Sequence, residues 1–358
     1  MALRAHLRIL VVATVVAIAA SVLAPFAPAQ PAEAHEVQRI AGSNRYATAV
    51  QVSQRTPYES RTVFLASGEG FADALAAGPV AAAEQARLLL TARGHVPQVV
   101  LEELARLSPV TPIPIVLVGG EASISDAVRQ QLADAGHQVD RIAGVDRVDT
   151  SMRLLDRLRS SGPVSEIWVV SGWSFADALV AGSVAGRNRG AIVLSYHGSS
   201  EADLLRWIDR VRPAYQGIGV NIAGGWPSVS QAAADWIRGT GAAGVWRYAG
   251  ENRYDTARRI HDQFSQQTWN GTMLLATGES FPDAMAASVL AAYGHTPLYL
   301  APRACNTEVA AMLRTERDER AIHTVFALGD DSALGLHATA MLDCPILAPA
   351  PSPIRPRP

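Results

Sequence analysis

Short apolar runs alternate along the chain with longer stretches of helical character. Residues 62–66 and 113–118 are apolar or β-branched runs, typical of strands buried on both faces of a parallel sheet. Residues 71–83, rich in Ala, and residues 96–107, with apolar side chains at helical spacing, predict helices. Two more strands are expected nearby, at 87–90 and 139–143, and a capped helix is expected at 123–132. Strands that alternate with helices favour an α/β fold with a parallel sheet covered on both faces.

This strand–helix pattern occurs three times, and three motifs mark it. R-x-A-G-x-x-R lies at 39–45, 141–147 and 247–253, and S/T-G-x-x-F-x-D-A-L/M lies at 67–75, 171–179 and 277–285. A third motif, rich in glycine, lies at 118–120, 223–225 and 328–330. Internal repeats indicate tandem structural units. We therefore predict three tandem α/β repeats, each with its own parallel sheet, in a pseudo-threefold arrangement.

The repeats divide the chain into five segments. Arg4 and Arg8 precede an apolar run at 9–23, and small residues follow around Ala34. The run is shorter than the ~20 residues that span a membrane, so the order predicts a secretory signal peptide over residues 1–34. The rest is expected to hold repeats at 35–140, 141–246 and 247–346, a last strand at 341–346, and a proline-rich disordered tail at 347–358. No later segment predicts a membrane span.

Composition narrows the classes of function. The chain has 358 residues, of which 49% are hydrophobic and 18% are charged, as in globular proteins. Its net charge of −2 lacks the basic footprint of a nucleic-acid-binding protein. None of the nine His residues recurs in all three repeats, and neither G-x-S-x-G nor H-E-x-x-H occurs. We therefore assign no catalytic residue, no cofactor and no metal ligand.

The three motifs together resemble the cell wall-binding repeat type 2 family, over residues 39–344. The resemblance implies open α/β sheets arranged as a pseudo-trimer, which hold secreted proteins on Gram-positive walls by binding anionic polymers. Two residues depart from the family pattern: Pro282 replaces Ala before Asp283, and Asp330 replaces the second Gly of the third motif.

The second motif offers candidate ligand contacts at three glycines: Gly68, Gly172 and Gly278. Each follows a strand and precedes a helix, where glycine permits a positive φ and a close approach of the backbone to a ligand. The first N–H groups of a helix bind anions, and ligands of open α/β sheets lie beyond the carboxyl ends of the strands. The alternative is a tight turn that binds nothing.

The charged residues of the motifs each allow more than one interpretation. An aspartate is expected in the first helical turn of each repeat: Asp73, Asp177 and Asp283. It compensates the helix dipole or pairs with arginine, binds ligand hydroxyls, or acts in catalysis. An arginine ends the first motif of each repeat: Arg45, Arg147 and Arg253. Each arginine either binds a phosphate or carboxylate of the polymer or forms an ion pair with one of the aspartates. Three weak local sites would add up through avidity.

The two cysteines, Cys305 and Cys344, both lie in the third repeat. An even pair in a secreted chain favours a disulfide, and closing a loop of about 40 residues would stabilise the fold by about 4 kcal/mol. A metal pair or free thiols are the alternatives.

These observations lead us to expect a non-catalytic, secreted, wall-associated protein. Its partner would be a teichoic-acid-like or other anionic polysaccharide, or peptidoglycan itself. One alternative is an amidase-like wall hydrolase that uses carboxylates such as Glu69 and Asp73. Glu279 matches Glu69 in the third repeat, but the second repeat has Trp173 there, so such a site would not be threefold. A self-assembling surface protein is the other alternative.

Overall fold

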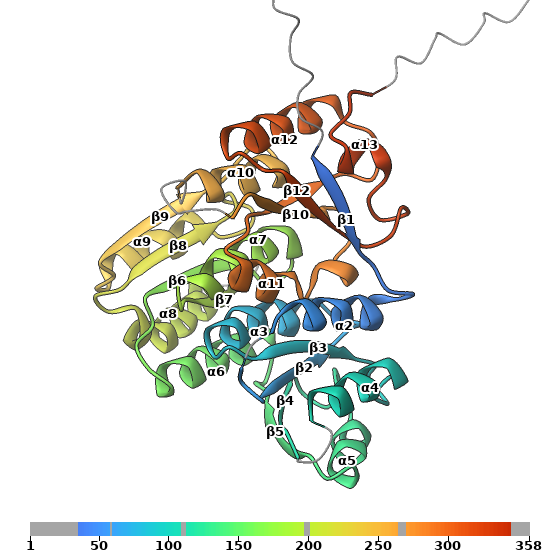
Figure 1. Ribbon diagram of the computed structural model, residues 1–358. Helices are drawn as coiled ribbons and strands as arrows, with labels where there is room; N and C mark the ends of the chain where they lie inside the picture. Colours follow the sequence, from blue (N-terminus) through green and yellow to red (C-terminus); the bar gives the residue numbers. More distant parts are fainter. Residues whose placement is uncertain (1–34, 58, 109–111, 197–200, 264–269, 345–358) are drawn as a thin grey trace, which may run out of the picture. The chain divides into compact units, whose positions relative to one another are not determined.

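The chain forms three parallel four-stranded sheets, one for each repeat (Figure 1). The first contains, in spatial order, β3 (Arg87–Thr91), β2 (Val63–Ser67), β4 (Pro114–Val118) and β5 (Gln138–Ile142). The second contains β7 (Ala191–Ser195), β6 (Glu166–Ser171), β8 (Gly219–Ala223) and β9 (Gly244–Tyr248). The third contains β11 (Leu298–Ala301), β10 (Thr272–Thr277), β12 (Thr324–Leu328) and β1 (Glu36–Ile40). The predicted fold of three tandem α/β repeats is confirmed.

This computed structural model describes residues 35–57, 59–108, 112–196, 201–263 and 270–344. The expected signal peptide and proline-rich tail therefore lie outside the described residues. Among the described helices, none combines the length and the apolar character needed to cross a membrane.

Each repeat carries a corresponding set of helices. The first has α2 (Arg45–Arg55), α3 (Ala72–Ala83), α4 (Gln98–Leu107) and α5 (Asp126–Asp134). The second has α6 (Arg147–Ser160), α7 (Phe175–Arg187), α8 (Glu201–Tyr215) and α9 (Gln231–Gly239). The third has α10 (Arg253–Gln263), α11 (Ala287–Gly294), α12 (Thr307–Glu319) and α13 (Leu336–Thr339). In the third repeat a 3₁₀ turn, η1 (Pro282–Ala284), precedes α11, so Asp283 lies in this turn and not in the first turn of an α-helix as predicted.

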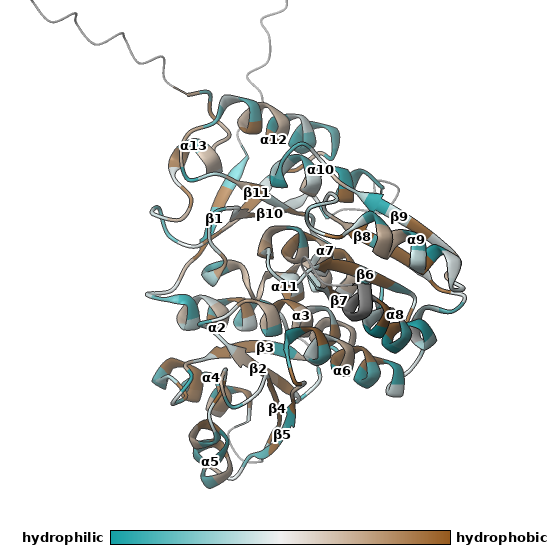
Figure 2. Cartoon of the chain, turned by 180° about the vertical axis from the view of Figure 1, so that it is seen from behind, coloured by the Kyte–Doolittle hydropathy of each residue, from teal (hydrophilic) through white to brown (hydrophobic). Residues whose placement is uncertain are grey.

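The strands of the first sheet divide their side chains between two apolar layers. Phe64 and Ala66 of β2 pack in the cluster that contains α3, whereas Val63 and Leu65 pack in a second cluster with α4 and α5. Because side chains alternate across a strand, both faces of β2 are covered, which explains its unbroken apolar run. The hydropathy of the chain follows this arrangement, since β2, β3 and β4 are mainly hydrophobic (Figure 2).

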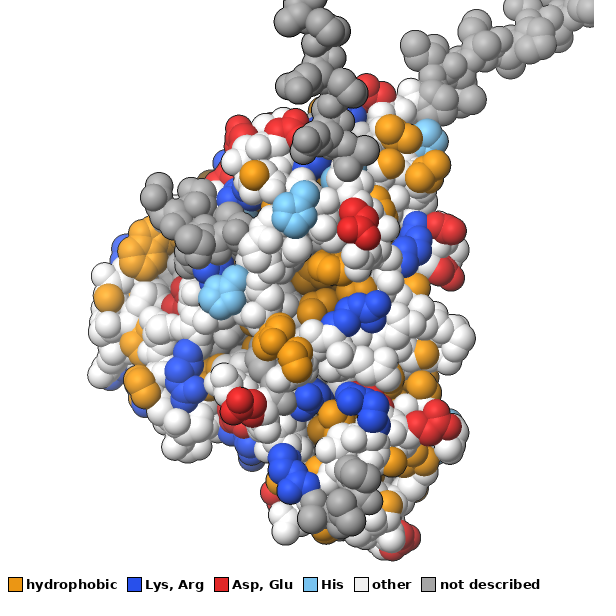
Figure 3. All heavy atoms as spheres, in the orientation of Figure 1, with side chains coloured by type: hydrophobic (Ala, Val, Ile, Leu, Met, Phe, Trp, Pro, Cys, Tyr) orange, Lys and Arg blue, Asp and Glu red, His pale blue; other side chains and the backbone are white. Residues whose placement is uncertain are grey.

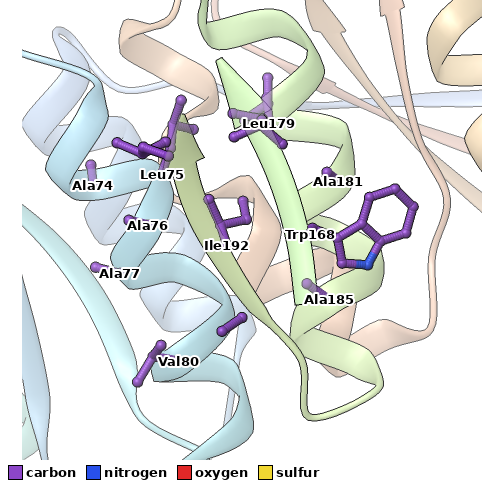
Figure 4. Packing of buried hydrophobic residues seen from close by; sticks show 14 of the residues in the cluster. Ala74, Leu75, Ala76, Ala77, Val80, Trp168, Leu179, Ala181, Ala185 and Ile192 are labelled. Carbon is purple, nitrogen blue, oxygen red and sulfur yellow. The ribbon is translucent and has the colours of Figure 1, made fainter. Parts of the chain in front are cut away.

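Three helices, one from each repeat, pack against one another in the centre: α3, α7 and α11. They are rich in alanine, and Figure 4 shows the small side chains of α3 and α7 together with Ile192 and Trp168. Glycine allows α7 to approach α3 closely, because a Cβ on Gly186 would lie only 2.9 Å from the Cβ of Ala82. The small residues of 71–83 thus form the contact between repeats.

The third sheet is completed by the strand that begins the described chain. β1 pairs in parallel with β12, with Glu36 opposite Thr324 and Ile40 opposite Leu328. The prediction of a last strand at 341–346 is wrong for the described part of that range, because residues 341–344 form a turn and an irregular segment. β1 already occupies the edge of β12 that such a strand would need.

The segment after α13 is held by other contacts. Arg314 donates hydrogen bonds to the carbonyl oxygen of Met341 and to Asp343. Cys305 and Cys344 form a disulfide, with Cα atoms 5.5 Å apart. The predicted disulfide is confirmed.

Candidate functional site

The first arginine of R-x-A-G-x-x-R ties one repeat to the glycine loop of a sheet. Arg141, at the end of β5, donates to the carbonyl oxygens of Gly119 and Ile124, both over 2.8 Å. Arg247 makes the equivalent bond to Gly224, over 2.9 Å. Arg39 makes it to Gly329 of the third repeat, over 3.0 Å. The motif strand therefore completes one sheet, and the residues after it begin the next repeat.

The second arginine of the motif contacts the glycine of the second motif. Arg45 and Arg147 donate to the carbonyl oxygens of Gly68 and Gly172, over 2.5 and 2.8 Å, and Arg253 donates to the carbonyl oxygen of Gly278. None of these three arginines forms an ion pair with a described carboxylate. The described residues therefore do not form the direct Arg–Asp ion pairs that the sequence allowed as an alternative.

The glycines of the second motif are buried beneath these arginines. A Cβ at Gly68 would lie 2.5 Å from the ring of Tyr46, and one at Gly278 would lie 2.8 Å from the ring of Tyr254. Their φ angles are not in the left-handed region, which corrects the expectation of a positive φ. The close approach that glycine permits is made by the repeat's own side chains.

A positive φ occurs instead in the third motif. Gly119, Gly224 and Gly329 have φ of 116°, 100° and 92°. A Cβ at Gly119 would lie 2.6 Å from a carboxylate oxygen of Asp73. The glycine is therefore required both by its backbone conformation and by the aspartate packed on it.

The three aspartates join the second motif to the third. Burial raises the pKa of Asp73 and of Asp177, and hydrogen bonds from Ser123 and Ser228 oppose that rise. In both cases the positive charge of an arginine in the next repeat also opposes the rise in pKa, as Arg147 does for Asp73. The aspartates are thus part of the joint between repeats, which supports their structural interpretation.

The phenylalanines of the second motif meet at the centre of the three repeats. The rings of Phe71, Phe175 and Phe281 lie with their centroids 5.4–6.2 Å apart, a range typical of attractive aromatic pairs. Arg147 lies over the Phe71 ring at 5.8 Å, and Arg253 over the Phe175 ring at 5.8 Å. All three rings are partly exposed. The sequence motif contained these residues, but nothing in it indicated that they meet.

A pocket of about 430 Å³ opens where the first and second repeats join. The second motif (Glu69–Asp73), the third motif (Gly120) with the nearby Ser123, and the next repeat's first motif (Gly144–Arg147) line it, together with Phe281. Arg147, Asp146 and Glu69 are exposed in this region. All three repeating motifs therefore contribute to one cavity at the carboxyl ends of the strands, where ligands of α/β sheets bind.

The pocket mixes one guanidinium with several carboxylates. Apart from the bond to Gly172, Arg147 donates no hydrogen bond to a described residue. Glu69 accepts a hydrogen bond from the backbone N–H of Arg93 over 3.0 Å. A guanidinium can bind a phosphate or carboxylate, and carboxylates can accept hydrogen bonds from hydroxyls. The described residues hold no cluster of three or more His, Cys, Asp or Glu arranged to take a metal ion.

The chain matches a known protein family in three segments. The model of the family described as cell wall binding domain 2 matches it three times, at residues 39–129, 141–234 and 247–336. The chain belongs to this family. Each matched segment contains all three motifs, so the repeats described above are cell wall-binding repeats.

Relatives of this chain include two proteins of Bacillus subtilis. The N-acetylmuramoyl-L-alanine amidase LytC is 29% identical over 259 residues, which are 72% of this chain and 49% of the amidase. The amidase enhancer is 27% identical over 157 residues, which are 44% of this chain and 20% of that protein.

Two solved structures from Clostridium difficile are similar in fold. Cwp6 has a TM-score of 0.73 and 28% identity, over 87% of this chain and 48% of that one. Cwp8 has a TM-score of 0.72 and 24% identity, over 85% and 51%. This chain thus spans about half the length of LytC and of Cwp6.

Within the cell wall-binding repeats, the structure brings two of the predicted site residues into one pocket. Arg147 and Asp73 both line the pocket between the first and second repeats, whereas Gly68 and Gly172 are buried behind the arginines. The disulfide cysteines are not among the residues that line it.

Proposed function

We propose that the chain attaches to the bacterial cell wall by binding an anionic wall polysaccharide at the junctions between its repeats. The observation that carries the proposal is the pocket lined by all three motifs, with the exposed Arg147 at its wall. In this proposal Arg147 binds a carboxylate or phosphate of the polymer, and Glu69 and Asp146 accept hydrogen bonds from its hydroxyls.

The charge of the molecule supports binding at local sites. The net charge is −2, and on the face shown in Figure 3 basic and acidic side chains are interspersed. Such a surface exerts no long-range attraction on a polyanion. Arg45 and Arg253 repeat the contacts of Arg147 at the other two junctions, so a polymer that engages several junctions gains affinity by avidity.

The family and the proposed ligand imply a secreted protein held on the envelope of a Gram-positive cell. In this role the chain is non-catalytic, and the repeats serve attachment. The expected signal peptide is consistent with this location.

The proposal is tested by substituting Arg147 and measuring affinity for purified cell wall. We expect Arg147→Ala to weaken binding about tenfold, as for the loss of a charge-assisted hydrogen bond, and binding by the native chain to weaken as salt rises. Arg153→Ala is the matched control, because Arg153 lies on the same helix and pairs with Asp149.

Thermal unfolding of both variants distinguishes lost binding from lost folding, since Arg147 also bonds Gly172. Folded Arg147→Ala that binds as tightly as Arg153→Ala would exclude the junction site. Release of soluble fragments from the wall would favour a hydrolase.

A further inference from the structure

The second repeat differs from the other two at two positions beside its sheet. Trp173 follows β6 and Trp226 follows β8. The other repeats have acidic residues at the corresponding positions: Glu69 and Glu121 in the first, Glu279 and Asp331 in the third. Both tryptophans are exposed, by 48% and 68%.

The two tryptophans lie at the same edge of the second sheet. β6 and β8 are neighbouring parallel strands, and Trp173 and Trp226 follow the carboxyl ends of these strands within three residues. In the first repeat, the corresponding loops contribute Glu69 and Gly120 to one pocket. We call Trp173 and Trp226 the indole edge.

Exposed tryptophan is unusual, because its large apolar ring is normally buried. At roughly 250 Å² of surface for each tryptophan, the indole edge exposes on the order of 300 Å². A stable protein interface needs about 800 Å² on each partner. The indole edge alone is therefore too small for a protein partner and has the size of a small-ligand contact.

The charges around the indole edge differ from those in the other repeats. Glu69 and Glu279 each accept a hydrogen bond from a backbone N–H, of Arg93 and Arg303, and keep a carboxylate at that position. In the second repeat the guanidinium of Arg147 lies over the Trp173 ring at 5.3 Å. An indole next to an exposed cation suits a ligand with an apolar face and a negative group.

We infer that the indole edge binds sugar rings of the wall polymer, with the C–H face of an acidic pyranose against the indoles and its charge towards Arg147. This inference rests on the proposed function. It makes the second repeat the one that stacks against sugar rings, because the first and third repeats have carboxylates and no indoles at the same positions.

The test compares variants of the full chain for binding to intact wall and to the polysaccharide released from it by acid. Trp173→Ala with Trp226→Ala removes both rings, and we expect affinity for both probes to fall about tenfold or more, as for a binding hot spot. Trp173→Phe with Trp226→Phe keeps aromatic faces and should restore most of the affinity.

Trp236→Ala is the matched control, because Trp236 is 44% exposed in the same repeat but lies on α9. Trp226→Ala alone changes an exposed loop side chain, so it measures the contribution of the indole edge even if Trp173→Ala disturbs the contact with Arg147. If the native chain binds wall and the double alanine variant binds equally well, the inference is wrong and the proposed function stands. If the native chain binds neither probe, the proposed function itself fails.

Discussion

Thr48 donates a hydrogen bond to the carboxylate of Asp283 over 2.9 Å, across 235 positions of sequence. This bond joins the first helix of the first repeat to the second motif of the last. Together with the pairing of β1 and β12, it closes the three repeats into a ring in which each repeat contacts the other two.

Loss of this bond should destabilise the fold. We expect Thr48→Val to lower the free energy of unfolding by about 1–3 kcal/mol, because Asp283 loses a donor in a partly buried position. Thr150→Val is the control: Thr150 also accepts a hydrogen bond from a motif glycine N–H, of Gly144. Chemical denaturation should show a larger loss for Thr48→Val, and equal losses would mean that the bond to Asp283 contributes nothing.

Deletion of residues 36–40 should open the third sheet. Removing β1 leaves β12 as an unpaired strand edge, and such edges promote association with other chains. We expect the shortened chain to unfold at lower temperature and to form oligomers in size-exclusion chromatography. Gln38→Ser, which changes only an exposed side chain of β1, should leave both properties unchanged. A monomeric deletion variant of native stability would show that β1 is dispensable.

Buried His261 should make stability depend on pH. Burial lowers the pKa of His261 to about 3 from 6.5, so between these values the unfolded chain binds the additional proton. The contribution of His261 to the free energy of unfolding is complete above about pH 6.5 and is lost as the pH falls towards 3. Relative to His261→Gln, the native chain should lose about 2 kcal/mol more between pH 7 and pH 5, as measured by urea unfolding. Parallel curves for the two proteins would contradict this pKa.

Reduction of the disulfide should weaken the third repeat. We expect Cys305→Ser with Cys344→Ser to lower the free energy of unfolding by about 4 kcal/mol, through the larger conformational freedom of the unfolded chain. The measurement is thermal or chemical unfolding of the double variant beside the oxidised chain. Reducing agent should have no further effect on the variant. Unchanged stability would show that the bonds of Arg314 hold the segment without the disulfide.

Much of the fold could be predicted because its signals are local. The apolar run at 113–118 became β4, and residues 139–143 largely coincide with β5. The role of β1 could not be predicted in this way, because Glu36 pairs with Thr324 and no local pattern specifies a partner so distant. The strand predicted at 341–346 does not form in its described part, because β1, from the other end of the chain, pairs with the edge of β12.

The candidate site was predictable in its residues but not in their contacts. The repeated motifs identified Gly68, Asp73 and Arg147, yet ligand contact and structural contact select the same residue types. Only the three-dimensional arrangement shows that Gly68 is covered by Tyr46 while Arg147 is exposed beside a pocket. The exposed Trp226 was missed because it lies just outside the motifs, although its contrast with Glu121 and Asp331 is visible in the aligned repeats.

Attachment through an anionic wall polysaccharide is tested most directly by cosedimentation of the native chain with purified Gram-positive cell wall. The chain is mixed with intact wall and with wall from which acid has removed the secondary polymers. We predict that it sediments with intact wall and stays in solution with the stripped wall. Equal sedimentation with both would identify peptidoglycan as the ligand, and absence of sedimentation with either would contradict the attachment function.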